Sequence, residues 1–144
     1  MSLLDSFDLM EIKLYYKYVK VGNGRKLVIL DDSKAEEMLK DEEKSKEIEV
    51  LETHWAMLNW KEQNEVMSAS SKVVDPMTGE KQFNFLVYRD AIIKKCLKQW
   101  NITVNEQAVP VTPDAIDQLP GPVVVNIYEK FDKYIEFSEE EMGN

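Results

Sequence analysis

The sequence predicts an α+β protein that is mainly α-helical: an N-terminal β-hairpin followed by a small bundle of four to five helices. Apolar and polar residues first alternate, a glycine-containing turn follows, and apolar residues later recur at steps of three and four. The chain has 144 residues, of which 44% are hydrophobic, so it can bury a core without disulfides or metal ions. We therefore expect an ordinary globular core built mostly from helices.

The hairpin is expected within residues 1–32. From Glu11 the apolar residues have a period of two, which predicts a half-buried strand. The turn Gly22-Asn23-Gly24 tolerates positive φ, and a second β-rich run extends from Lys26 to Leu30. Because a lone two-stranded hairpin is only marginally stable in water, it must pack on the rest of the chain or pair through its edge.

Residues 33–50 are expected to form a charged helix or hinge. Ser33 precedes Glu36 by three positions, which is the spacing of a capping box at the start of a helix. The following stretch, Lys40 to Glu49, is charged almost throughout. This composition is typical of a solvated helix with ion pairs at i,i+4, and it would also suit a linker between a hairpin module and a helical module.

Residues 51–137 are expected to form a helical domain. The periodicity predicts helices at 48–68, 84–101, 112–118 and 123–137. Turn sequences containing Pro76, Gly79 and Pro120-Gly121-Pro122 separate them, and Thr112-Pro113 is a strong helix start. Residues 138–144 are rich in Glu, and we expect them to be a frayed acidic tail.

The charge and the cysteine count limit the classes of partner. The chain carries 18 Lys+Arg against 27 Asp+Glu, a net charge of −9, which disfavours nucleic acid as a partner. No signal peptide and no membrane-spanning apolar run is recognised, so we expect no membrane partner. A single cysteine allows no internal disulfide and fits a reducing cytoplasm. We therefore expect a cytoplasmic protein.

The sequence contains no recognisable catalytic constellation, and we expect a protein that is not an enzyme. His54 is the sole imidazole and adjoins Trp55, where it is expected to be a partly exposed helical residue. Cys96 lies on an apolar helix face and is expected to be an inert, buried thiol. The carboxylates occur in charge runs without a calcium-loop or H-E-x-x-H pattern. Neither a cofactor nor a metal site is therefore expected.

Aromatic residues on the predicted helices are the best candidates for binding a protein partner. Most of them are expected to lie in the core, because the apolar stripes of neighbouring helices bury one another. Trp60 departs from the apolar line of its segment and is followed by Lys61, so it is the first candidate for a partly exposed anchor. The candidate partner-binding residues are Trp55, Trp60, Trp100, Tyr128 and Phe131.

Residues 51–137 resemble the tail assembly chaperones of long-tailed bacteriophages. The similarity lies in the order of a Trp-bearing segment at 52–60, a second helix ending at Lys98-Gln99-Trp100, the segment Thr112 to Leu119, and a final amphipathic helix. The resemblance implies a mostly helical, non-enzymatic protein of the host cytoplasm. It also implies that the protein binds the tape measure protein, helps to recruit tail tube subunits, and is absent from the finished virion.

Two further expectations concern assembly. Apolar helical grooves would suit a long amphipathic client, and the negative charge would keep such a complex soluble. The open hairpin edge could pair with a client strand or drive self-association. The hairpin and the charged hinge would also suit an alternative role, that of a structural subunit of a phage tail, neck or baseplate.

Overall fold

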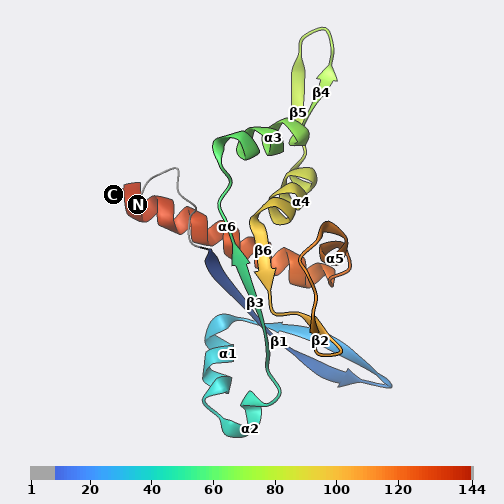
Figure 1. Ribbon diagram of the computed structural model, residues 1–144, viewed down its shortest axis with the longest axis vertical. Coiled ribbons are helices and arrows are strands. Elements are labelled where there is room, and N and C mark those ends of the chain that lie inside the picture. Colours follow the sequence, from blue (N-terminus) through green and yellow to red (C-terminus); the bar gives the residue numbers. More distant parts are fainter. Residues whose placement is uncertain (1–8, 144) are drawn as a thin grey trace.

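The structure, a computed structural model, describes residues 9–143, with side chains described for residues 9–136. Helices and strands are mixed along the chain, and the centre of the structure is a four-stranded antiparallel sheet in the order β2-β1-β3-β6 (Figure 1). The expected mainly helical bundle is therefore wrong. The difference arises because two segments expected to be helical, residues 49–55 and 97–100, are strands of this sheet.

Strands β1 (Met10–Val21) and β2 (Gly24–Leu30) form the hairpin predicted from the alternation. Their register runs from Tyr15 opposite Leu30 to Val21 opposite Gly24, and Gly22 has a positive φ of 59° at the turn. The hairpin does not stand alone, because the first half of β1 also pairs with β3. This pairing joins residues of the predicted 1–32 unit to residues of the predicted 51–137 unit in one sheet.

Strand β3 (Glu49–Trp55) replaces the first part of the helix expected at 48–68. Its side chains alternate, with Leu51, Thr53 and Trp55 buried and the intervening residues more exposed. The spacing of Leu51, Trp55 and Leu58 fits a helix as well as it fits a strand. The strand alternation is hard to recognise in the sequence because one of the buried positions is occupied by the polar Thr53. Pairing with β1, which places Leu14 opposite Leu51, decides for the strand.

Strand β6 (Leu97–Trp100) completes the sheet and shortens the helix expected at 84–101, which is α4 (Phe85–Cys96). Where β6 ends, the side chain of Asn101 continues the pairing. Its Oδ1 accepts from the Glu52 amide at 2.9 Å, and its Nδ2 donates to the Val50 carbonyl at 3.0 Å. One amide side chain thus satisfies two backbone groups of β3 that β6 is too short to reach.

The charged segment is packed against the hairpin. It contains α1 (Asp32–Leu39) and α2 (Glu42–Ser45), and Ala35 and Ile48 form a small buried cluster with Leu30. The N-cap of α1 is Asp31, whose Oδ1 accepts from the Lys34 amide at 2.8 Å, so the helix begins earlier than the Ser33–Glu36 spacing predicted. Most of the charged side chains in this segment are exposed.

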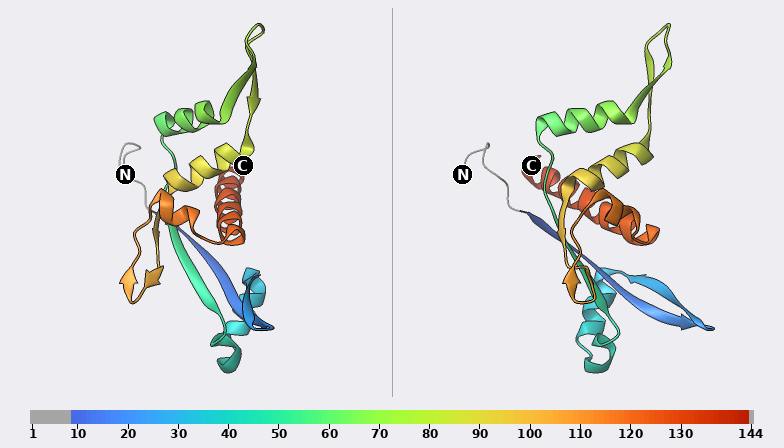
Figure 2. Two further views of the ribbon diagram at one scale, coloured as in Figure 1. Left: turned by 90° about the vertical axis from the view of Figure 1, so that its right-hand side faces the viewer. Right: turned by 45° about the vertical axis from the view of Figure 1, so that its right-hand side comes forward.

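The long helix α6 (Gly121–Gly143) runs alongside the sheet (Figure 2). Its residues Val123, Ile127 and Phe131 are buried in the main core with residues of β1, β3 and α4. Helix α5 (Pro113–Asp117) precedes it and has the predicted cap, with the Thr112 hydroxyl accepting from the Ala115 amide. The tail predicted at 138–144 lies outside the residues whose side chains are described.

Two hairpins project from this body. Helix α3 (Trp60–Ser70) leads into β4 (Ser71–Asp75) and β5 (Glu80–Phe83), which extend away from the sheet beyond α4 (Figures 1 and 2). The tip of the β1–β2 hairpin extends in a different direction. A small third hairpin consists of β7 (Thr103–Val104) and β8 (Gln107–Ala108). None of the helices in the described part of the chain is long and apolar enough to cross a membrane.

Candidate functional site

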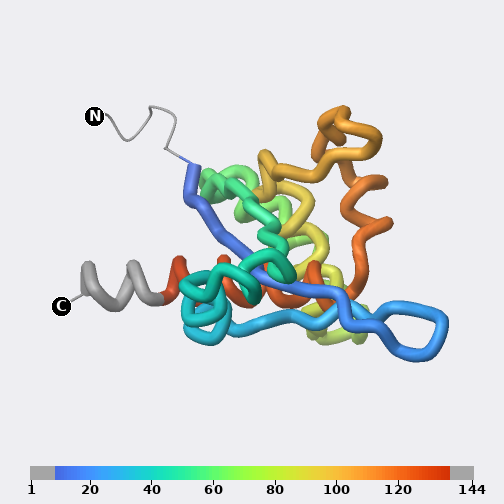
Figure 3. The backbone as a smooth tube through the Cα atoms, turned by 90° about the horizontal axis from the view of Figure 1, so that it is seen from below, coloured from blue at the N-terminus to red at the C-terminus, as the bar shows by residue number. Residues whose placement is uncertain are grey.

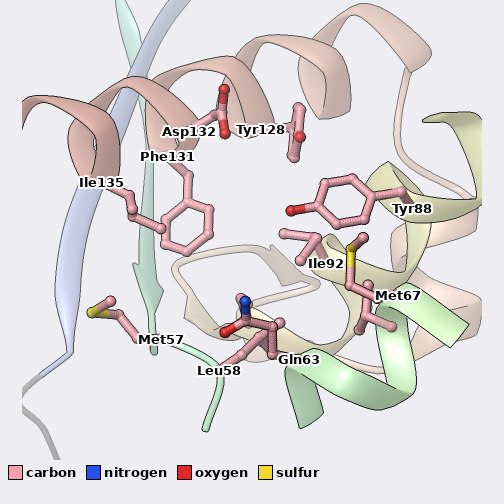
Figure 4. Close-up of a pocket in the computed structure, with 12 residues that line it drawn as sticks. Met57, Leu58, Gln63, Met67, Tyr88, Ile92, Tyr128, Phe131, Asp132 and Ile135 are labelled. Carbon is pink, nitrogen blue, oxygen red and sulfur yellow. The ribbon is translucent and has the colours of Figure 1, made fainter. Parts of the chain in front are cut away.

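A groove lined mostly by apolar residues, which we call the α3–α6 groove, opens between α3, α4 and α6 (Figure 4). Its cavity has a volume of about 210 Å³. The lining residues come from the loop before α3 and from the three helices: Met57, Leu58, Gln63, Val66, Met67, Tyr88, Ile92, Cys96, Tyr128, Phe131, Asp132 and Ile135. The groove therefore joins segments that are far apart in the sequence.

A capping box fixes the start of α3 and so the near wall of the groove. Asn59 accepts from the Glu62 amide at 2.8 Å, and the Glu62 carboxylate accepts from the Asn59 amide at 3.1 Å. Gln63, Val66 and Met67 then follow at helical spacing, which places them on one face of α3. An ion pair at 3.1 Å between Glu65 and Lys95 links α3 to α4.

Stacked aromatic rings hold the opposite wall. The rings of Trp55 and Phe131 stack with centroids 4.5 Å apart and an interplanar angle of 18°. The Trp55 indole donates to the Thr53 hydroxyl at 2.7 Å, and that hydroxyl donates to the Ile12 carbonyl at 2.7 Å. This buried chain of hydrogen bonds orients Trp55, and Trp55 in turn fixes the ring of Phe131.

The rim of the groove contains two half-exposed methionines, Met57 at 49% and Met67 at 43%. Unbranched thioether side chains adapt to differently shaped apolar partners. Aromatic contacts continue from the groove along the beginning of α4: the Phe83 ring lies 5.4 Å from that of Tyr88, and Phe85 lies 6.2 Å from Tyr128. The half-exposed Phe83 and Phe85 thus extend the apolar surface beyond the cavity.

Two tyrosine hydroxyls and one carboxylate supply polarity at the α4–α6 side of the groove (Figure 4). Burial, with a contribution from Asp132, raises the pKa of Tyr128 to about 12. Burial and the same carboxylate also raise the pKa of Tyr88. Both phenols therefore stay protonated at neutral pH and can donate hydrogen bonds to a bound partner.

The thiol of Cys96 forms part of the groove floor and is 1% exposed, so its predicted burial is confirmed. Burial raises its pKa to about 12, although the nearby lysines Lys98 and Lys95 lower it. Because the thiolate is the nucleophilic form, this thiol is a poor nucleophile at neutral pH. His54 was expected on a helix but lies on strand β3. Its Nε2 is 3.4 Å from a carboxylate oxygen of Glu11.

The five sequence-predicted partner-binding residues occupy four kinds of position. Tyr128 and Phe131 line the groove, and Trp55 supports Phe131 from the core. Trp100 is partly buried away from the groove lining, and its indole donates to the Val109 carbonyl at 2.6 Å. Trp60 is 74% exposed on α3, as its break from the apolar line predicted.

Met57, Met67 and Tyr88 all line the groove, and none of them is among the site residues predicted from the sequence. The only signal for the methionines was their position beside the apolar stripe of residues 51–66. This position does not predict a groove when residues 49–68 are expected to form one helix. The groove exists because the chain leaves strand β3 at Trp55 and passes through a loop at residues 56–59 before α3 begins.

Among residues 9–136, no group of three or more His, Cys, Asp or Glu side chains is placed so that it could hold a metal ion. No family model, curated protein or solved structure matches the chain. The function must therefore be argued from the groove and from the surface.

Proposed function

We propose that the protein is a non-enzymatic chaperone that binds an amphipathic helix of a client protein in the α3–α6 groove. The observation that carries this proposal is the cavity between helices, which is lined mostly by apolar residues, with Met57 and Met67 half-exposed on its rim. A groove between helices is a common receptor for the apolar face of a partner helix. Flexible methionines let such a groove accept more than one sequence of the client.

The dimensions of the groove favour a protein segment over a small molecule. Pockets for drug-sized ligands usually enclose about 300–1,000 Å³. The cavity of about 210 Å³ is smaller, and the apolar surface continues along α4 through Phe85. A helix could insert one or two apolar side chains between Met67 and Phe131 and lie along this surface. Its polar face would then meet the hydroxyls of Tyr88 and Tyr128.

The resemblance to tail assembly chaperones suggests the identity of the client. On this proposal the client is the tape measure protein of a long-tailed bacteriophage, the complex forms in the host cytoplasm, and it helps to recruit tail tube subunits. The net charge of −9 would keep a client-coated complex soluble. The mostly helical fold that the resemblance implied is not found, so the proposal rests on the groove and the charge.

Co-expression with the tape measure protein encoded in the same gene neighbourhood tests the proposal. The client is expected to co-purify with this chain and to be more soluble than when it is expressed alone. Met57→Glu together with Met67→Glu should abolish co-purification, because a buried charge in the groove is costly. Met77→Glu is the matched control, since Met77 is 94% exposed at the tip of the β4–β5 hairpin. Failure of the wild-type chain to co-purify with the client or to solubilise it would refute the proposal.

A second candidate is a structural subunit of a phage tail, neck or baseplate. It is favoured by the position of β2 at the edge of the sheet, where its outer backbone groups are open to pairing. Mass spectrometry of purified particles separates the two candidates. A stoichiometric amount of this chain in finished virions would favour the structural subunit and contradict a transient chaperone.

A further inference from the structure

The outer half of the β1–β2 hairpin is a two-stranded ribbon, of which only the base, through Leu27 and Val28, packs on the hydrophobic clusters. Strand β1 pairs with β3 only as far as Tyr16, whereas its pairing with β2 continues to Val21. Residues 17–28 therefore extend past the four-stranded sheet, as Figures 1 and 3 show. We call these residues the ribbon. Within it Tyr18, Val19 and Val21 are exposed apolar or aromatic side chains.

The ribbon is positively charged in an otherwise strongly acidic chain. Residues 17–28 contain Lys17, Lys20, Arg25 and Lys26 and no Asp or Glu. Since the whole chain has 18 Lys+Arg and 27 Asp+Glu, the remainder carries 14 basic residues against those 27 acidic ones. The ribbon and the remainder thus have opposite net charges.

The cations differ in their surroundings: Lys17, at the base of the ribbon, lines a hollow with Glu37 and Asp41 of the same molecule, whereas Lys20 and Arg25 lie nearer the tip. Lys20 and Arg25 are directly opposite each other in the register, an arrangement in which like charges destabilise a strand pair. The Arg25 guanidinium lies 4.2 Å from the centre of the Tyr18 ring. No ion pair found among the residues with described side chains includes a cation of the ribbon. An acidic partner would relieve the repulsion between Lys20 and Arg25.

The same chain has an acidic surface of the required kind. Residues 31–49 contain nine Asp and Glu against four Lys. Glu36 and Glu37 on α1, and Glu42 and Glu43 on α2, are exposed and belong to none of the ion pairs described for residues 9–136. The ribbon tip points away from α1 and α2 in Figures 1 and 3, and pairing with β2 fixes its direction. The tip could therefore reach these helices only in another molecule.

We propose that the ribbon of one molecule docks on the acidic α1–α2 surface of a second copy of the chain. The contact is head-to-tail, because two different surfaces meet, and such contacts generate rings or open filaments. Ribbon-to-ribbon pairing is disfavoured because it would bring two sets of cations together. Nucleic acid is disfavoured because the acidic remainder of the chain would repel its phosphates. This self-association does not depend on the client proposed for the α3–α6 groove.

Charge reversal on each surface tests the proposal with the full-length chain. Sedimentation velocity would be measured for the wild type, for the ribbon variant Lys20→Glu/Arg25→Glu, and for the helix variant Glu36→Lys/Glu37→Lys. The wild type is expected to associate, and each variant alone is expected to associate about tenfold more weakly or not at all, since the reversal removes the attraction between the two surfaces and adds repulsion. An equimolar mixture of the two variants should associate again, because both contacts then join opposite charges.

A matched control separates the specific contact from the effect of net charge. Lys72→Glu/Lys81→Glu changes the net charge by the same amount as the ribbon variant, but on the exposed β4–β5 hairpin. It is expected to associate like the wild type. Circular dichroism spectra like that of the wild type would show that each variant is folded. Three results would each overturn the proposal: a monomeric wild type at the highest soluble concentration, an equal effect of the control, or no association in the mixture.

Discussion

The side chain of Trp55 connects the core to the wall of the groove. It is fully buried, donates to Thr53, and stacks on Phe131 in the groove wall. Trp55→Ala is expected to lower the free energy of unfolding by about 3–5 kcal/mol, because it leaves a large cavity. Trp60→Ala, on an exposed ring, should change it by less than about 0.5 kcal/mol. Urea unfolding followed by circular dichroism checks both, and equal effects would contradict the placement of the two indoles.

The buried Cys96 and Tyr128 and the partly buried Tyr16 predict a loss of stability in alkali. Burial raises the pKa of each group to about 12 in the folded chain. Below about pH 7 all three are neutral in both states, so their contribution to stability is complete. As the pH rises from about 8 towards 12, the thiol and then the phenols ionise in the unfolded chain while they stay protonated in the folded chain, so the free energy of unfolding falls. Urea unfolding at about pH 7, 10 and 11 checks this, and a constant value up to about pH 11 would contradict it.

The stability of helix α3 depends on the capping box between Asn59 and Glu62 at its N-terminus. Asn59→Ala removes the capping box and is expected to cost about 1 kcal/mol of stability. Because the start of α3 positions Met67 in the groove, the same substitution should also weaken client binding. Asn59→Asp, which retains an oxygen acceptor, should restore most of the stability. Urea unfolding of the two variants compares them, and equal losses would show that the cap does not determine the stability of α3.

The β4–β5 hairpin is expected to be dispensable for folding. It extends beyond α3 and α4, and a hydrogen bond of 2.7 Å from the Asn84 amide to the Ser70 carbonyl closes its base. Replacing residues 72–82 by a short glycine turn should change stability by less than about 1 kcal/mol, since halving a loop changes its closure cost by only about 0.6 kcal/mol. Loss of cooperative thermal unfolding in the shortened chain would contradict this.

The elements differ in how far the sequence could predict them. The β1–β2 hairpin and the cap of α5 are confirmed because alternation, Gly22 and Thr112-Pro113 are local signals. Strand β3 was missed because its stability comes from pairing with Met10–Tyr16, about forty residues away, and Leu51 and Trp55 also fit a helical period. The groove could not be predicted from the sequence. Its walls lie next to one another because β3 and β6, both expected to be helical, are neighbouring strands of the sheet.

Three surfaces of different chemical character lie in different parts of the molecule. The α3–α6 groove is lined mostly by apolar residues, the ribbon is cationic, and the α1–α2 surface is acidic. The groove lies towards one end of the molecule, whereas the ribbon and α1–α2 lie at the other (Figure 1). A client in the groove and a second copy on the ribbon can therefore be bound at the same time. Self-association would then place several grooves along a long client, which would raise its effective affinity.

Photo-cross-linking tests the central claim, that the α3–α6 groove receives the client, most directly. A photo-reactive side chain would be placed at Met67 on the groove rim or at Met77 on the distal hairpin, and each variant would be co-expressed with the tape measure protein. If the groove receives the client, position 67 is expected to cross-link to an apolar residue of a client helix and position 77 is not. Cross-linking from position 77 alone, or from neither position while the client still co-purifies, would show that the client binds elsewhere.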